Sequence, residues 1–155
     1  MKNEYEINKG TLAVISMEDG KTKILEDSQD YIIPCSSYDI LDHSCKYFGS
    51  SYEGRRAGAK AIIGANYKLP IVIQDNLNIV FFPTMSPTDK RCIWIAVNKI
   101  KSYIAEQFNT TRIIFENDME LVVPISYRVV ENQIYRSTRL VHLLNERRSD
   151  VNKVM

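Results

Sequence analysis

The fold is indicated first by residues 11–25, which read Thr-Leu-Ala-Val-Ile-Ser-Met-Glu-Asp-Gly-Lys-Thr-Lys-Ile-Leu. Two apolar runs, Thr11–Ser16 and Thr22–Leu25, flank the turn signal Glu18-Asp-Gly20. Such runs on either side of a glycine-containing turn are typical of an antiparallel β-hairpin. The front of the chain is therefore predicted to be β-structure with short connections.

Similar apolar runs recur along the chain and predict more short strands. Asp75-Asn76 and Asn117-Asp118 each separate two such runs, so two further hairpins are expected there. Pro34 ends the run before it, because proline cannot donate to a β-ladder. The strands predicted after the first hairpin are residues 30–33, 70–73, 77–82, 92–97, 100–105, 111–115 and 119–123.

Two helices are expected among these strands. The first covers residues 38–48, with Ser37 as its N-terminal cap and Gly49 at its end. The second runs from Ser126, a possible cap, to about Arg148, because apolar and small residues recur there at three- and four-residue steps. We expect residues 149–155 to be frayed.

Residues 50–60 are compatible with a short helix or with a loop. Gly54 and Gly58 would each cost about 1 kcal/mol in a helix relative to alanine. The predicted fold class is α+β: a largely antiparallel β-sheet, a helix near residues 38–48 and a long C-terminal helix near 126–148.

The composition is that of one globular domain, which we expect to span residues 1–155. Hydrophobic residues make up 45% of the chain and charged residues 25%. The first residues lack an apolar stretch typical of a signal peptide, and the longest apolar run, Cys92–Val97, is far too short to span a membrane. Three cysteines without CxxC spacing suit reduced thiols. We therefore expect a cytoplasmic protein without membrane contact.

The formal net charge is only +1, but the charges are unevenly distributed. Residues 1–45 hold four basic and nine acidic residues, and residues 46–112 hold ten basic and four acidic ones. Residues 113–155 hold six of each. Nucleic-acid-binding proteins usually carry a clear basic excess, which here is confined to the middle of the chain.

Catalytic and metal-binding motifs are weak. His43 and Cys45 form one close pair, whereas a structural zinc site needs four ligands, usually in two close pairs. Cys92 and His142 could form a nucleophile–base pair, but Cys92 begins an apolar strand, where a buried thiol is expected. We therefore expect no enzymatic activity, no catalytic residue, no metal site and no cofactor.

The segment from Gly49 to Arg56 has the glycine spacing of a phosphate-binding P-loop but lacks the Lys-[Ser/Thr] that must follow. Its glycines and arginines remain suited to a nucleic-acid backbone, because glycine lets backbone N–H groups approach a phosphate and arginine presents a planar fork to it. A solvated turn is the alternative interpretation of this segment.

Further basic residues favour an extended anionic partner. Lys90 and Arg91 follow a polar loop, and Lys99 and Lys101 alternate, which places both on one face of a strand. Arg136 and Arg139 lie one turn apart on the final helix. The predicted DNA-binding residues are Arg55, Arg56, Lys60, Lys90, Arg91, Lys99, Lys101, Arg136 and Arg139.

Two docking geometries are open for the basic segment. A helix at 38–48, a Gly-Ser-Ser turn and a second helix would outline a helix-turn-helix with Arg55 and Arg56 aimed at a major groove. We prefer contact with the backbone or minor groove, because the glycines disfavour that second helix.

Several motifs closely resemble those of the ComK family, the competence transcription factors of Firmicutes. In chain order they are Cys45-Lys-Tyr-Phe-Gly-Ser-Ser-Tyr-Glu-Gly-Arg-Arg-Ala-Gly58, Lys68-Leu-Pro-Ile-Val72, Phe81-Phe-Pro-Thr-Met-Ser86, Pro124-Ile-Ser-Tyr127 and Glu131-Asn-Gln-Ile-Tyr-Arg136.

The resemblance implies a cytoplasmic, DNA-binding transcriptional activator of DNA-uptake genes. Family members bind paired A·T-rich boxes in double-stranded DNA, mainly through the minor groove, and act as homo-oligomers assembled from dimers. The resemblance also implies two kinds of protein partner. One is RNA polymerase, and the other is an adaptor, MecA, that delivers the activator to a Clp protease. Longer members continue past the final helix with an adaptor-recognition tail, whereas this sequence stops at Met155. A protein-interaction or regulatory module of the same fold, without effective DNA binding, is the alternative function.

Overall fold

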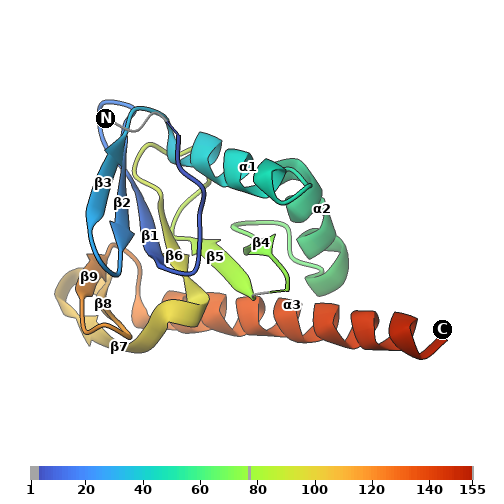
Figure 1. Ribbon diagram of the computed structural model, residues 1–155. Helices are drawn as coiled ribbons and strands as arrows, with labels where there is room; N and C mark the ends of the chain where they lie inside the picture. Colours follow the sequence, from blue (N-terminus) through green and yellow to red (C-terminus); the bar gives the residue numbers. More distant parts are fainter. Residues whose placement is uncertain (1–3, 77, 155) are drawn as a thin grey trace.

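The computed structural model describes residues 4–76 and 78–154, which form two antiparallel sheets and three helices (Figure 1). The predicted α+β class and both predicted helices are confirmed. None of the helices in the described ranges is long and apolar enough to cross a membrane.

The larger sheet has six strands in the order β3-β2-β1-β6-β5-β4. Its neighbouring strands are all antiparallel, and Val14 of β1 lies opposite Trp94 of β6 at the centre. The strands are close to those predicted, except that β5 begins at Ile79 and Leu77 lies outside the described residues. The bounds are β1 Thr11–Ser16, β2 Thr22–Glu26, β3 Asp30–Ile33, β4 Ile71–Gln74, β5 Ile79–Pro83 and β6 Ile93–Ala96.

The smaller sheet has three strands in the order β7-β8-β9, namely Ile100–Glu106, Thr110–Phe115 and Glu120–Val123. A 3₁₀ turn, Val97–Lys99, precedes β7. The prediction that Lys99 and Lys101 share one strand face is wrong, because Lys99 belongs to that turn. In addition, the β7–β8 register shifts between Ile100 and Ser102, which interrupts the alternation at Lys101.

Helix α1 covers Ser37–Tyr47. Its cap is Ser36 rather than the predicted Ser37, because the Ser36 hydroxyl accepts a hydrogen bond from the Asp39 N–H at 3.1 Å. Gly49 ends the helix as expected: its φ of +86° lets the Ser50 N–H reach the Cys45 carbonyl at 2.9 Å.

Helix α2 covers Tyr52–Ile63, so the loop alternative for residues 50–60 is wrong. The Ser51 hydroxyl caps its start, and Gly64, with a φ of +72°, ends it. The helix buries Tyr52 and Ala59 against the body of the protein. Tertiary packing of one face and two caps offset the propensity cost of the glycines.

Helix α3 covers Tyr127–Val154. The Ser126 hydroxyl accepts from the Val129 N–H at 3.3 Å, which confirms the predicted cap. The helix continues past Arg148, so the frayed tail is wrong for residues 149–154, where no glycine or proline interrupts it; Met155 lies outside the described residues.

The larger sheet is covered on both faces (Figure 1). Helices α1 and α2 lie on one face over a core that includes Trp94 and Phe81. The smaller sheet and the start of α3 lie on the other face, around Phe82, Phe115 and Val130. A third apolar cluster, which includes Ala59 and Leu140, joins α2 to the middle of α3.

Candidate nucleic-acid interface

Helix α2 presents its basic residues on two separate flanks. Arg56 lines a hollow beside the helix together with Tyr52 and Glu53. Lys60 lies one turn further along the same flank. Arg55 lies on the other flank, close enough to Cys45 of α1 for its charge to act on that thiol. The structure therefore places Arg56 and Lys60 on one flank and Arg55 on the other, although all three were predicted to form one DNA-binding group.

The loop after α2 is held in place by two side chains of α3. The Gln133 amide, which is 2% exposed, donates to the carbonyls of Lys68 at 2.9 Å and Pro83 at 3.1 Å. The Arg136 guanidinium donates to the Tyr67 carbonyl and to the Gln133 side-chain oxygen, each at 2.8 Å. These bonds hold Lys68 in a left-handed conformation with φ of 50°.

Arg136 is consequently a residue that fixes a loop, and at most part of its guanidinium is left for an external ligand. Burial lowers the pKa of its guanidinium from the ordinary value. Its Nε is buried without a hydrogen-bond partner, and both oxygens that it contacts are uncharged. No carboxylate in the described ranges forms an ion pair with it. Its positive charge is thus uncompensated beneath the loop that carries Tyr67.

A groove runs past this loop along the N-terminal sides of α1 and α2. It consists of two adjoining hollows of about 540 Å³ and 270 Å³ that share Tyr38, Pro87 and Thr88. The larger one holds Arg56, Tyr67 and Lys68, and the smaller one holds Lys21 and Lys90. The lining therefore brings together basic residues from four distant parts of the sequence.

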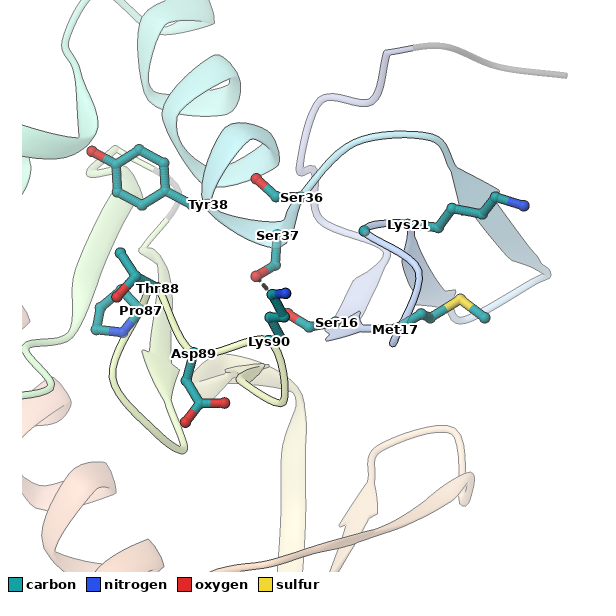
Figure 2. A pocket seen from close by; sticks show the side chains of 11 residues that line it. Ser16, Met17, Lys21, Ser36, Ser37, Tyr38, Pro87, Thr88, Asp89 and Lys90 are labelled. Carbon is teal, nitrogen blue, oxygen red and sulfur yellow. Dashed lines mark hydrogen bonds between the residues drawn. The ribbon is translucent and has the colours of Figure 1, made fainter.

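Figure 2 shows the smaller hollow, where the start of α1 meets the β1–β2 turn and the loop before β6. The Ser16 and Ser37 hydroxyls are hydrogen-bonded at 2.7 Å, drawn as a dashed line. Lys90 lies in front of this pair, whereas the Lys21 side chain extends away from it. Lys21 ion-pairs with Asp19 at 3.5 Å, so Lys90 is the more available cation.

The remaining predicted residues are distributed over other surfaces. Arg91 forms a two-pronged contact with Asp89, at 3.1 and 3.0 Å, and Lys101 ion-pairs with Asp118 at 2.9 Å. These contacts raise the pKa of both basic groups. Lys99 is half-buried and Arg139 is exposed. Of the predicted set, Arg56 and Lys90 line the groove, and Lys60 lies one turn from Arg56 along α2.

Two of the three cysteines, Cys45 and Cys92, are buried. Burial raises the pKa of Cys92 to about 11 and that of Cys45 to about 12. His142 is on the exposed side of α3 and pairs with Glu146 at 3.3 Å, whereas Cys92 is in the core between the larger sheet and α1. His43 points to Glu6 at 2.9 Å, while Cys45 is fully buried. The ligand atoms of Glu4, Glu6 and His43 lie within 4.8 Å of one another, and the hydrogen bond with Glu6 accounts for the position of His43.

Sequence reasoning missed Tyr67, Lys68, Lys21 and Gln133. The motif Lys68-Leu-Pro-Ile-Val72 carries the family resemblance but predicts no binding role by itself. One signal was present: Asn66-Tyr-Lys68 is a polar and aromatic stretch between a helix and a buried strand. Loops that connect regular elements often carry binding residues.

Comparisons with known proteins agree on one relationship. The sequence model of the ComK protein family matches residues 2–149. The competence transcription factor of Bacillus subtilis (strain 168) is 39% identical over 139 residues, which cover 88% of this chain and 72% of that protein. No solved structure matches the chain.

Proposed function

Because the chain belongs to the ComK family, we propose that it is a transcriptional activator of competence genes that binds A·T-rich double-stranded DNA, mainly through the minor groove. The observation that carries the DNA-binding part is the groove lined by Arg56, Lys68 and Lys90. The competence transcription factor of Bacillus subtilis supports the regulatory part.

The groove carries an excess of positive charge: Lys21, Arg56, Lys68 and Lys90 line it together with Glu53 and Asp89. Lys60, Lys68 and Lys90 form no ion pair with any described carboxylate, and the nearest contact between Arg56 and Glu53 is a long 3.9 Å. Cations without partners gain a phosphate contact without first breaking an internal pair. They would also release condensed counterions from DNA on binding. Arg91 and Lys101 would have to leave Asp89 and Asp118, so we place them outside the main contact.

The footprint is extended by the other predicted residues. Arg55 lies on the α1 side of α2, and Arg139 is one turn beyond Arg136 on α3. Lys99 belongs to the turn before β7. We propose that these residues add weaker phosphate contacts when two protomers occupy paired boxes, and that RNA polymerase and a MecA-type adaptor with a Clp protease are further partners.

The test is a salt titration of binding to A·T-rich and G·C-rich duplexes by fluorescence anisotropy. The parent protein should prefer the A·T-rich duplex. The double variant R56Q/K60Q should reduce the log–log salt slope by about 0.9 for each phosphate contact that is lost. The control K9Q/K101Q removes the same charge from residues that are exposed but do not line the groove. Equal slopes for the two double variants would contradict the proposed interface.

A protein-interaction module without DNA binding is the second candidate. It is favoured by the outer face of the smaller sheet, where Ile104 and Val122 are 49% and 44% exposed. Arg112, which lies between them in the register, is paired with Glu106 and Glu120, each at 2.7 Å. This face is thus apolar and locally acidic, which suits a protein better than DNA. If micromolar protein in low salt changes the fluorescence anisotropy of neither duplex, this candidate would be favoured.

A further inference from the structure

The most exposed aromatic residue of the groove is also anchored through its backbone. Tyr67 is 82% exposed, although a tyrosine gains free energy from burying its ring. Its carbonyl is held by Arg136 at 2.8 Å, and the next carbonyl, of Lys68, is held by Gln133 at 2.9 Å. The side chain is therefore presented to solvent by a loop whose backbone is fixed from beneath.

This fixation has a cost that packing alone does not explain. Lys68 adopts a left-handed φ of 50°, which is unfavourable for a residue with a side chain. Gln133 is almost fully buried, and the partly buried guanidinium of Arg136 has no acidic partner among the described residues. Such strained and desolvated groups tend to gather where a fixed geometry serves binding.

The neighbours of Tyr67 match the chemistry of a DNA groove. Lys68 and Arg56 line the same hollow as Tyr67 and would contact phosphates beside the inserted ring, although Glu53 also lines this hollow. Asn66, also in this lining, carries an amide that can donate to the acceptors on the minor-groove edge of A·T pairs. The uncompensated charge of Arg136 adds positive potential beneath the loop.

We propose that Tyr67 inserts into the minor groove as a wedge that partly unstacks one base step and bends the duplex. Gln133 and Arg136 are positioning residues that keep the Tyr67 loop from yielding when the base step opens. Flexible pyrimidine–purine steps of A·T-rich DNA deform most readily, so the wedge would favour such sequences without a base-specific hydrogen bond from the ring. This inference rests on the proposed function and specifies how the same groove engages its DNA.

The experiment compares Y67A, Y67F and the parent on a short duplex with an A·T-rich centre. The duplex carries a donor and an acceptor dye at its ends to report bending, and 2-aminopurine at the central step to report unstacking. The parent should bend the duplex and raise the 2-aminopurine fluorescence. Y67A should bind about 10-fold or more weakly, with both signals lost and an unchanged salt slope, because no phosphate contact is removed. Y67F should retain both signals, since the ring rather than the hydroxyl acts as the wedge.

Two further variants make the result specific. Y135A removes another tyrosine that is 64% exposed but does not line the groove, and it should behave as the parent. R136K keeps the charge but replaces the planar fork, whose two nitrogens hold the Tyr67 carbonyl and the Gln133 oxygen, by a single nitrogen on a flexible stem, so bending should fall while the salt slope stays unchanged. Bending by R136K equal to that of the parent would show that Arg136 is not a positioning residue.

The outcomes separate this inference from the proposed function. If the parent binds no duplex, the proposed function fails and the wedge fails with it. If the parent binds A·T-rich DNA and Y67A binds and bends it equally well, only the wedge is wrong. Circular dichroism melting curves of all variants should coincide with that of the parent except for R136K, because the replaced tyrosine rings are largely exposed.

Discussion

Replacing Gly58 by alanine tests both the existence of α2 and the way in which it meets DNA. Gly58 lies in the interior of α2, and a Cβ added there would meet no atom within 4 Å. Alanine is about 1 kcal/mol more favourable than glycine in a helix interior. We therefore expect G58A to be more stable than the parent by about this amount. In a domain of this size the gain corresponds to a rise in Tm of about 2–4 °C.

The measurement is urea unfolding followed by circular dichroism, with the slope m compared between the two proteins. An increase in the midpoint at constant m reports a true gain in stability. A matched control is G49A, which places a Cβ at a φ of +86° and should destabilise the protein. Lower stability of G58A would refute the helical assignment of this segment.

The same position distinguishes the two docking geometries of α2. Arg56 and Lys60 lie on the groove flank, whereas Gly58, two residues from each, lies on another side of the helix. If DNA occupies the groove, G58Q should bind A·T-rich DNA as tightly as the parent. If α2 enters a major groove as the second helix of a helix-turn-helix, the added side chain should obstruct it. A loss of affinity of 10-fold or more, about 1.4 kcal/mol, would refute the groove geometry.

Three further predictions concern the body of the protein. The pKa of Cys92 is raised to about 11 from an ordinary 9.0, so its thiolate fraction at pH 8 falls roughly 100-fold. Iodoacetamide should therefore label the partly exposed Cys35 first and Cys92 only after unfolding, and mass spectrometry of the labelled protein measures this order. Asp42 accepts from the Lys46 ammonium and from the Tyr52 N–H, each at 2.9 Å, and these bonds lower its carboxyl pKa below 3.8. The unfolding free energy of D42A should therefore be lower than that of the parent by about 1 kcal/mol at neutral pH. Because the ionised carboxylate provides this stabilisation, the difference between the two proteins in urea unfolding should shrink as the pH falls below 3.8. Phe108 is 92% exposed at a left-handed φ of 59°; F108N should raise the unfolding free energy by about 1 kcal/mol, and an unchanged melting temperature would count against strain at this turn.

Local patterns predicted most of the fold because the strands and caps are local features. The apolar runs gave the strands to within two residues, and Gly49 marked the end of α1. Ser36 and Ser37 are adjacent potential caps; in the fold Ser36 has the extended backbone of a cap, and the Ser37 hydroxyl is bonded to Ser16 instead. Helix α2 could not be decided locally, since its glycines oppose it and the burial of Tyr52 and Ala59, which favours it, is tertiary.

The candidate site was harder to predict because its residues meet only in the folded chain. Charge and spacing identified Arg56, Lys60 and Lys90 as candidate cations; Arg56 and Lys90 line the groove, and Lys60 is one turn from Arg56 on α2. They gave no means of knowing that Asp118, seventeen residues away, engages Lys101. The bond between Arg136 and the Tyr67 carbonyl joins residues on α3 and a distant loop. A residue that appears as a free cation in sequence is thus committed to the backbone in the fold.

Helix α3 has a consequence for how the protein opens. Along its length it contacts β7 and β8, then β5, and then α2, and between these contacts it holds the Tyr67 loop. Since one continuous helix carries all of these contacts, the slowest amides of β8, β5 and central α3 should exchange with deuterium at one common opening free energy. Weakening the smaller sheet would then loosen the Tyr67 loop by the same amount, so amide exchange in that loop would report damage in a region of the protein that it does not touch.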